Sequence, residues 1–150
     1  MKRMMNDTRG IERNPIRPSN FSQPYWDGTR ERRLLLQFCP ITHQYQFYPR
    51  PVSIFTGRQN LEWREVAGNR TIYSYTIAEL GPGPFRGQEP YLIALVELNM
   101  HVRVLANIVE CDAEQIKIGM PVQPDWLPLK DGTHLLMFRP RLMETPDDNC

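Results

Sequence analysis

The stretch CPITHQYQFYPRPVSIFT, from Cys39 to Thr56, has the build of a small zinc ribbon. A ribbon uses two Cys-x-x-Cys knuckles, and the first would consist of Cys39 and Thr42. The second would consist of Ser53 and Thr56. Hydroxyls are not ionised at pH 7 and are poor zinc ligands. Even with the neighbouring His43 included, the stretch supplies only two strong ligands, Cys39 and His43. We therefore expect no zinc here, but a metal-free remnant.

Aromatic packing is the expected substitute for the lost metal, because a structural zinc contributes roughly 10 kcal/mol of folding free energy. The aromatic side chains available for this are Phe38, Tyr45, Phe47, Tyr48 and Phe55.

Nucleophile and base pairs are not apparent elsewhere in the sequence, so we assign no catalytic residue. Cys111 precedes Asp112 at an expected helix start, where a thiolate would be stabilised. Such a cysteine is more often a small buried apolar residue. His43, His101 and His134 share no motif and are interpreted as surface or strand-end residues.

Secondary-structure signals indicate a mainly β protein with one short helix within residues 20–33. Strands are expected at 33–39, 44–49, 61–68, 70–80, 91–98, 102–110, 120–129 and 133–140, with a short helical turn at 111–119. The C-terminal part therefore gives about five strands with one short helix, which is typical of a Greek-key barrel of the OB type. Another small barrel or a sandwich is the alternative.

The expected organisation has four parts. Residues 1–33 form an N-terminal arm and short helix, 34–60 the degenerate ribbon, 61–141 the OB-fold domain, and 142–150 a disordered tail. A Gly/Pro-rich loop at 81–90 is predicted to be mobile.

Bulk properties narrow the function classes. The 150 residues carry a net charge of +1, which provides no global basic field for nucleic acid or an anionic membrane. The chain has no apolar run of about 18 residues and no signal-peptide pattern at its start. Its three cysteines form no disulfide framework, so a cytoplasmic protein is expected.

Six segments, taken in order, resemble the DUF35 proteins. They are YWDGTRERRLLLQFC (25–39), FYPRPVS (47–53), LEWREVAGNRTIYSYTI (61–77), PYLIALVEL (90–98), LANIVECDAEQIKIGMPV (105–122) and FRP (138–140). The resemblance covers roughly residues 20 to 141 and implies an N-terminal helix, a rubredoxin-like zinc ribbon and an OB-fold domain. The chain departs from the family at Thr42, Ser53 and Thr56, where most members have cysteine, so metal binding is not carried over.

The resemblance also implies a function. DUF35 proteins are generally non-catalytic partners of thiolase-fold enzymes, including thiolases, acyltransferases and side-chain aldolases. We accordingly expect an accessory subunit in an α2β2-like hetero-oligomer, with acyl-CoA as a substrate shared with the partner and no tightly bound cofactor. Its docking patch is expected on the ribbon remnant and the region between Phe55 and Trp63.

Binding of CoA phosphates would need fixed cationic donors beside an apolar slot. The candidates are Arg50 in the PRP turn, Arg103 and Asn107 on one strand, and Arg139 with Arg141 after the last strand. Each arginine is also compatible with an ordinary exposed, solubilising role.

Two other functions remain open. A single-stranded nucleic-acid-binding OB module would use the cluster of Arg64, Arg70, Tyr73 and Tyr75, although Glu62 and Glu65 lie close by in sequence. A free-standing enzyme acting on acyl-CoA would turn over a thioester by itself.

Overall fold

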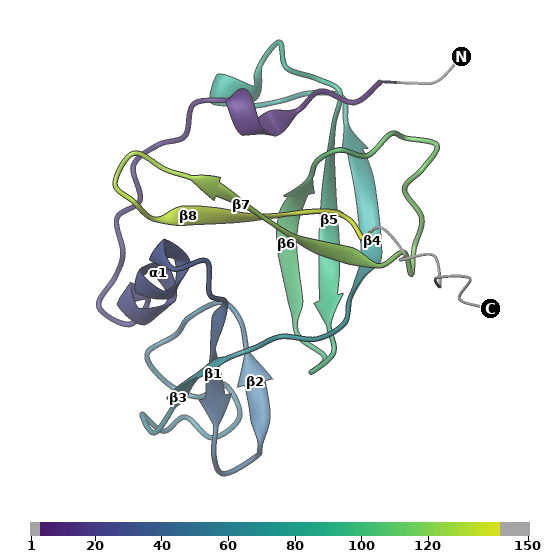
Figure 1. Cartoon of the computed structure of the whole chain (residues 1–150). Helices are drawn as coiled ribbons and strands as arrows, with labels where there is room; N and C mark the ends of the chain where they lie inside the picture. The colour runs from purple at the N-terminus through teal and green to yellow at the C-terminus, as the bar shows by residue number, and fades with distance from the viewer. Residues whose placement is uncertain (1–3, 142–150) are drawn as a thin grey trace, which may run out of the picture.

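The computed structural model describes residues 4–141, so the expected disordered tail at 142–150 lies outside the described residues. These residues form two sheets, one short α-helix and two single-turn 3-10 helices (Figure 1). The helical elements are η1 (Thr8–Gly10), α1 (Gln23–Arg30) and η2 (Gly83–Phe85). The strands are β1 (Leu35–Cys39), β2 (Gln44–Gln46), β3 (Glu62–Glu65), β4 (Arg70–Ala78), β5 (Tyr91–Leu98), β6 (Arg103–Ile108), β7 (Val122–Pro128) and β8 (His134–Pro140).

The small sheet is the ribbon, and its strand order is β2-β1-β3. β3 pairs with β1 in antiparallel register, with Leu35 opposite Glu65. The five-stranded sheet therefore begins at Arg70, and the strand expected at 61–68 pairs with the ribbon although we assigned it to the OB-fold domain. β3 stays with the ribbon because the next residue, Val66, is held there: its amide donates to the Leu34 carbonyl at 2.9 Å, and its side chain is buried. This apolar contact extends the ribbon sheet by one strand.

The five-stranded sheet has the order β4-β5-β6-β8-β7, with a parallel pairing between β6 and β8. A bridge between Thr71 and Pro121 joins β4 to the segment before β7 and brings the two edges of the sheet together. The prediction of an OB-type barrel is confirmed. Its core contains Phe138, Ile72 and Leu92, all at most 1% exposed. Burial of such side chains stabilises a fold by about 1.5–3 kcal/mol each.

The expected short helix at 111–119 forms only a single turn. The amides of Gln115 and Ile116 both donate to the Asp112 carbonyl, and no helix follows. Tertiary contacts stop it, because Ile116 is buried in the core and the Gly119 amide donates to the Ile72 carbonyl at 2.7 Å. The expected helical turn is therefore present, but it does not continue into a helix, because the segment is drawn onto β4.

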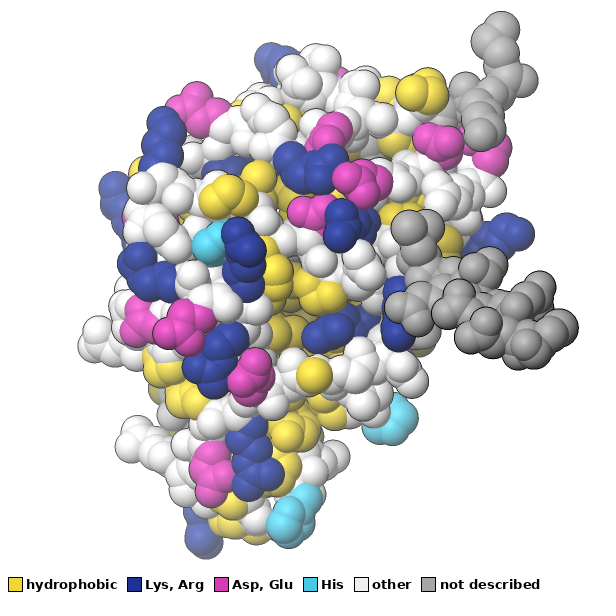
Figure 2. Space-filling view, viewed as in Figure 1, with side chains coloured by type: hydrophobic (Ala, Val, Ile, Leu, Met, Phe, Trp, Pro, Cys, Tyr) yellow, Lys and Arg dark blue, Asp and Glu magenta, His cyan; other side chains and the backbone are white. Residues whose placement is uncertain are grey.

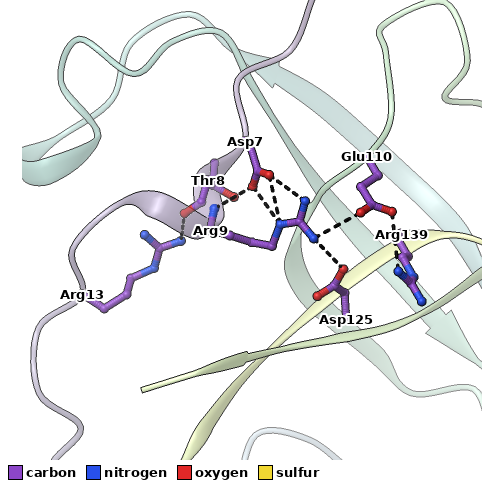
Figure 3. Close-up of polar contacts among 7 residues, drawn as sticks. All are labelled: Asp7, Thr8, Arg9, Arg13, Glu110, Asp125 and Arg139. Carbon is purple, nitrogen blue, oxygen red and sulfur yellow. Dashed lines mark hydrogen bonds and ion pairs between the residues drawn. The ribbon is translucent and has the colours of Figure 1, made fainter. Parts of the chain in front are cut away.

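The N-terminal arm lies against the barrel rather than extending freely. Arg9 pairs with Asp7 at 2.6 Å, and its guanidinium also reaches Glu110 at 3.3 Å and Asp125 at 3.1 Å (Figure 3). The hydrogen bond from Arg9 lowers the pKa of the Asp7 carboxyl. The neighbouring Thr8 is fully buried. The arm is therefore anchored by charge to the loop after β6 and to β7.

The same arm holds the Gly/Pro-rich loop at 81–90, which we expected to be mobile. The Asn6 side-chain amide donates to the carbonyls of Gln88 and Glu89, at 2.8 and 3.0 Å. The Glu89 carboxylate in turn accepts the Gly81 amide at 2.7 Å, which closes the loop on itself.

No helix in the described part of the chain has the length and apolar character to cross a membrane.

Candidate functional site

Two knuckles of the same shape are present in the ribbon despite the missing cysteines. In the first, the Cys39 carbonyl accepts the His43 amide at 2.8 Å. In the second, the Ser53 carbonyl accepts the Gly57 amide at the same distance. Both knuckles end in a left-handed residue, with φ of 55° at His43 and 73° at Gly57. Glycine adopts this conformation readily, whereas histidine does so only under structural constraint.

The side chains at the former ligand positions also converge. The Ser53 hydroxyl accepts the amides of Phe55 and Thr56, at 3.1 and 3.3 Å. Hydrogen bonds to the Cys39 thiol from Ser53 first, and from Thr42 second, lower its pKa to about 7 against the opposing effect of burial. Within residues 4–141, the geometry gives the buried Thr42 Oγ1 no hydrogen-bond partner, so its effect on the thiol is weaker than that of Ser53. Two of the three hydroxyls, those of Ser53 and Thr42, therefore act on the remaining thiol, whereas the Thr56 hydroxyl accepts the Arg58 amide at 3.3 Å.

This set of one thiol and three hydroxyls does not fit a structural zinc, which needs a closed set of four strong ligands. Within residues 4–141, no three His, Cys, Asp or Glu side chains are grouped so that they could hold a metal ion. The expectation that zinc is not bound stays a prediction, and we derive no role for a metal.

A pair of buried glutamines ties the second knuckle to the sheet. Gln37 on β1 accepts the Arg50 amide and donates to the Arg50 carbonyl, both at 2.8 Å. Gln46 on β2 accepts the Ile54 amide at 2.9 Å, and its Nε2 donates to Gln37 Oε1 at 2.9 Å. Both side chains are less than 5% exposed. They fix the loop between the knuckles without a metal.

The ribbon is therefore stabilised by hydrogen bonds as well as by aromatic packing, whereas we expected aromatic packing alone. The rings of Phe38 and Tyr45 lie 4.9 Å apart, as expected for a packed pair. The glutamine pair was missed because isolated glutamines give no sequence signal. The sequence feature that could have indicated the pair is the position of Gln37 within the otherwise apolar run LLLQFC.

Replacement of Gln46 by alanine should lower the free energy of unfolding by about 1–3 kcal/mol, because the part-buried Ile54 amide loses its acceptor and Gln37 Oε1 loses one of its two donors. Urea denaturation would measure the change. Gln44→Ala is the matched control, since Gln44 lies on the same strand but is exposed. Equal destabilisation by both substitutions would contradict a specific role for Gln46.

The proposed CoA-binding residues do not form one cluster. Arg103 pairs with Glu97 at 3.1 Å and stacks on the Tyr73 ring at 3.6 Å. Arg139 pairs with Glu110 at 3.6 Å, near the N-terminal arm (Figure 3).

The other two candidates lie apart from these arginines. Asn107 is near the far end of β6 from Arg103, where it makes one long contact of 3.5 Å to the Leu92 carbonyl. Arg50 is exposed on the ribbon loop. A role in CoA binding stays a prediction for each of the four.

A groove of about 630 Å³ separates the ribbon from the barrel, and we call it the ribbon–barrel groove. Its lining includes Tyr45, Phe47, Ile54, Phe55, Met100 and Arg103. Figure 2 shows hydrophobic side chains exposed between the small ribbon part at the bottom and the larger barrel above it. Of the candidate CoA-binding residues, only Arg103 lines this groove. The groove lies between two modules, which is where ligand and partner sites are most common.

The surroundings of the buried thiol Cys111 disfavour its thiolate form. Burial, together with the nearby Asp112 carboxylate, raises its pKa to about 11. The thiol is therefore protonated and 6% exposed, which agrees with its interpretation as a small apolar core residue.

A three-stranded sheet followed by a five-stranded barrel of the OB type defines the class: an OB-fold protein. Residues 63–127 match the family model described as the C-terminal OB-fold domain of ChsH2. A DUF35 domain-containing scaffold protein of Pyrococcus furiosus is 34% identical over 100 residues, which cover 66% of this chain and 73% of that protein. The chain belongs to the DUF35 family.

Two further similar proteins are a larger relative and a chain of a solved structure. A probable enoyl-CoA hydratase alpha subunit of Thermomonospora curvata is 35% identical over 139 residues, covering 89% of this chain. Our chain spans only 43% of the length of that relative. A chain of the solved Ltp2–ChsH2 (DUF35) aldolase superimposes with a TM-score of 0.72 at 33% identity, covering 83% of this chain and 98% of that one.

Proposed function

We propose that this chain is a non-catalytic accessory subunit of a thiolase-fold enzyme that acts on acyl-CoA or a similar acyl substrate. The observation that carries the proposal is the match to 98% of a chain in the Ltp2–ChsH2 (DUF35) aldolase, at 33% identity. The name of the Thermomonospora relative, an alpha subunit of an enoyl-CoA hydratase, also points to a component of a larger acyl-CoA enzyme. A thiolysis, acyl-transfer or aldol reaction would reside in the partner.

The chemistry of the described residues supports an accessory role. Cys111 is protonated and buried, and Cys39 is fully buried within the ribbon. Neither thiol is positioned to attack a thioester that approaches from solvent. Both cysteines are free, which agrees with our proposal of a cytoplasmic, reducing location.

The ribbon–barrel groove is the proposed docking surface for the large subunit. Ile54 is 56% exposed and Phe55 is 38% exposed on its ribbon side, and Tyr48 nearby in the ribbon is 52% exposed. Apolar side chains grouped in this way on a soluble protein usually mark an interaction surface. Arg103 lines the same groove, so of the four candidates it is the one that we propose to meet an acyl-CoA in an α2β2-like assembly.

The nucleic-acid alternative gains no support from the arrangement of its cluster. Arg64 lies on β3 in the ribbon, pairs with Glu62 at 2.8 Å and covers the Phe38 ring at 3.7 Å. Tyr73 lies on β4 in the other sheet, beneath Arg103. The basic and aromatic side chains therefore do not form one stacking surface.

Co-expression with a thiolase-fold protein encoded beside this chain tests the proposal. We expect the two proteins to purify together and to turn over an acyl-CoA substrate only as a complex. Thioester turnover by this chain alone, or separate elution of the two proteins, would contradict an accessory function.

A further inference from the structure

We propose that a small aromatic pocket between α1, the ribbon and the barrel binds an uncharged ring compound that carries a hydrogen-bond acceptor, such as a carbonyl oxygen. This pocket is separate from the ribbon–barrel groove, with which it shares only Phe47. The site therefore goes beyond the proposed function, and the isolated chain is sufficient to test it.

Three parts of the fold meet at this pocket. α1 packs against both β1 of the ribbon and β8 of the barrel, so it lies in the corner between the two modules (Figure 1). Residues from β6 and from the chain just after β2 complete the walls. The volume is about 270 Å³, and we call this site the aromatic pocket. Its lining includes Tyr25, Trp26, Phe47, Tyr48, Leu105 and Leu136.

Aromatic rings set at different angles form much of the wall. Tyr25 and Trp26 are neighbours on α1, and their rings are nearly perpendicular, at 88°, with centroids 5.0 Å apart. The Phe47 ring lies 5.7 Å from that of Tyr25, and the Tyr48 ring lies 4.2 Å from that of Phe47. Aromatic rings pack edge to face or offset face to face. Walls with rings in several orientations therefore favour a flat ring as the ligand.

The Tyr25 side chain supplies a hydrogen-bond donor to the pocket. Tyr25 is 7% exposed, and its hydroxyl makes no hydrogen bond within residues 4–141. A buried phenol usually has a hydrogen-bond partner. The hydroxyl oxygen is not fully covered by protein atoms, so it borders the pocket that Tyr25 lines. Burial first, and the nearby Tyr48 second, raise the pKa of Tyr25 to about 12, so at neutral pH the phenol keeps its proton and can donate it.

The charge of the ligand follows from the other lining residues. Among the residues that the structure describes, none that lines the aromatic pocket is charged. Ser22 is already engaged, because its hydroxyl accepts the Ser19 amide at 2.9 Å and donates to the Ser19 carbonyl at 3.2 Å. A carboxylate or an ammonium would lose its hydration here without gaining an ion pair. An uncharged ligand with an acceptor oxygen loses little and provides the Tyr25 hydroxyl with a partner.

The pocket volume limits the size of the ligand. Drug-sized ligands occupy pockets of about 300–1,000 Å³, so 270 Å³ suits a compound of one or two rings. Such a compound can enter from solvent, because Leu105 and Tyr48 at the rim are 54% and 52% exposed. A cation is the competing class of ligand, since aromatic faces also attract cations. The experiment therefore includes an arm that separates the two classes.

Titration of the full chain with prodan, a neutral naphthalene ketone, should shift the emission of the dye to the blue as it leaves water. Tyr25→Phe should weaken binding about fivefold to tenfold, which is the effect of one lost hydrogen bond. Tyr75→Phe is the matched control, because Tyr75 is 39% exposed and does not line the pocket. Absence of binding to the wild-type chain overturns the proposal, as does equal binding by the two variants.

Three competitors with the same ring system identify the class of ligand. Acetylnaphthalene is neutral, naphthoate is an anion and naphthylmethylammonium is a cation. Acetylnaphthalene should displace prodan at concentrations at least about tenfold lower than either ion requires, because the lining offers no opposite charge. Displacement by either ion at an equal or lower concentration contradicts a site for neutral rings.

Two further variants locate the dye. Leu105→Trp should block the aromatic pocket from its rim, whereas Phe55→Ala alters only the ribbon–barrel groove. Loss of binding in Phe55→Ala but not in Leu105→Trp would place prodan in the groove and overturn the proposal. The melting temperature of Tyr25→Phe should match that of the wild-type chain, and a marked fall would indicate a structural role for the hydroxyl instead. Since every measurement uses the isolated chain, failure here leaves the accessory function untouched.

Discussion

Replacing Thr42, Ser53 and Thr56 together by cysteine should convert the ribbon into a site that binds about one equivalent of zinc, whereas the wild-type chain should hold less than about a tenth of an equivalent. The backbone for such a site is already in place. Both knuckles keep their turn hydrogen bonds, and the amides of Phe55 and Thr56 already point at the Ser53 side chain. A thiolate there would accept the same two bonds.

The size of the effect follows from the coupling of metal binding to folding. Structural zinc contributes about 10–16 kcal/mol of apparent binding free energy in small zinc modules at pH 7. Even part of this should raise the melting temperature of the zinc-loaded variant well above that of the wild-type chain. Elemental analysis and thermal denaturation, with and without a chelator, measure the two effects.

The matched control carries the same three cysteines with Cys39→Ser added. With three ligands instead of four, it should bind zinc much more weakly and lose most of the stabilisation. If the control and the triple variant bind equally, the four positions do not converge on one ion, and our account of the knuckles is wrong.

Replacing Ile54 and Phe55 by aspartate should abolish co-purification with the large subunit, with a loss of affinity of about 30-fold or more. Both side chains line the ribbon–barrel groove and are exposed in the isolated chain. Burying two carboxylates in an apolar interface is costly, whereas their presence on the free surface is not. The stability of the isolated subunit should therefore change little.

Ile118→Asp serves as the control for this surface, because Ile118 is 71% exposed but does not line the groove. It should leave complex formation intact. If Ile118→Asp disrupts the complex and the groove variant does not, the large subunit docks on the 111–119 side of the barrel instead. Circular dichroism of each isolated variant excludes loss of fold as the cause.

Local signals predicted those parts of the molecule whose structure depends on neighbours along the chain. The alternation of YLIALVEL and the run from Val102 to Ile108 indicated strands, and β5 and β6 pair in that register. Knuckle spacing indicated a ribbon, and both turns are present at Cys39 and Ser53. Such features depend on backbone geometry and side-chain periodicity, which are visible in the sequence.

Contacts between distant segments were not visible in this way. The pattern of 61–68 is equally suitable for either sheet, and only the buried contact of Val66 with the ribbon decides between them. The arm has no periodicity, yet Arg9 finds Glu110 and Asp125 more than a hundred residues away. Two of the candidate CoA-binding residues form ion pairs that the sequence did not indicate. Arg103 pairs with Glu97, and Arg139 pairs with Glu110.

The sequence by itself thus determined the type of protein: a mainly β chain with a ribbon that has lost its thiolates, followed by an OB-type barrel. Only the tertiary structure decided which charges are neutralised and which are left over. The physical reason is that ion pairing depends on distance in space, and only the folded chain brings Arg9 beside Glu110 and Asp125, which are more than a hundred residues away in sequence.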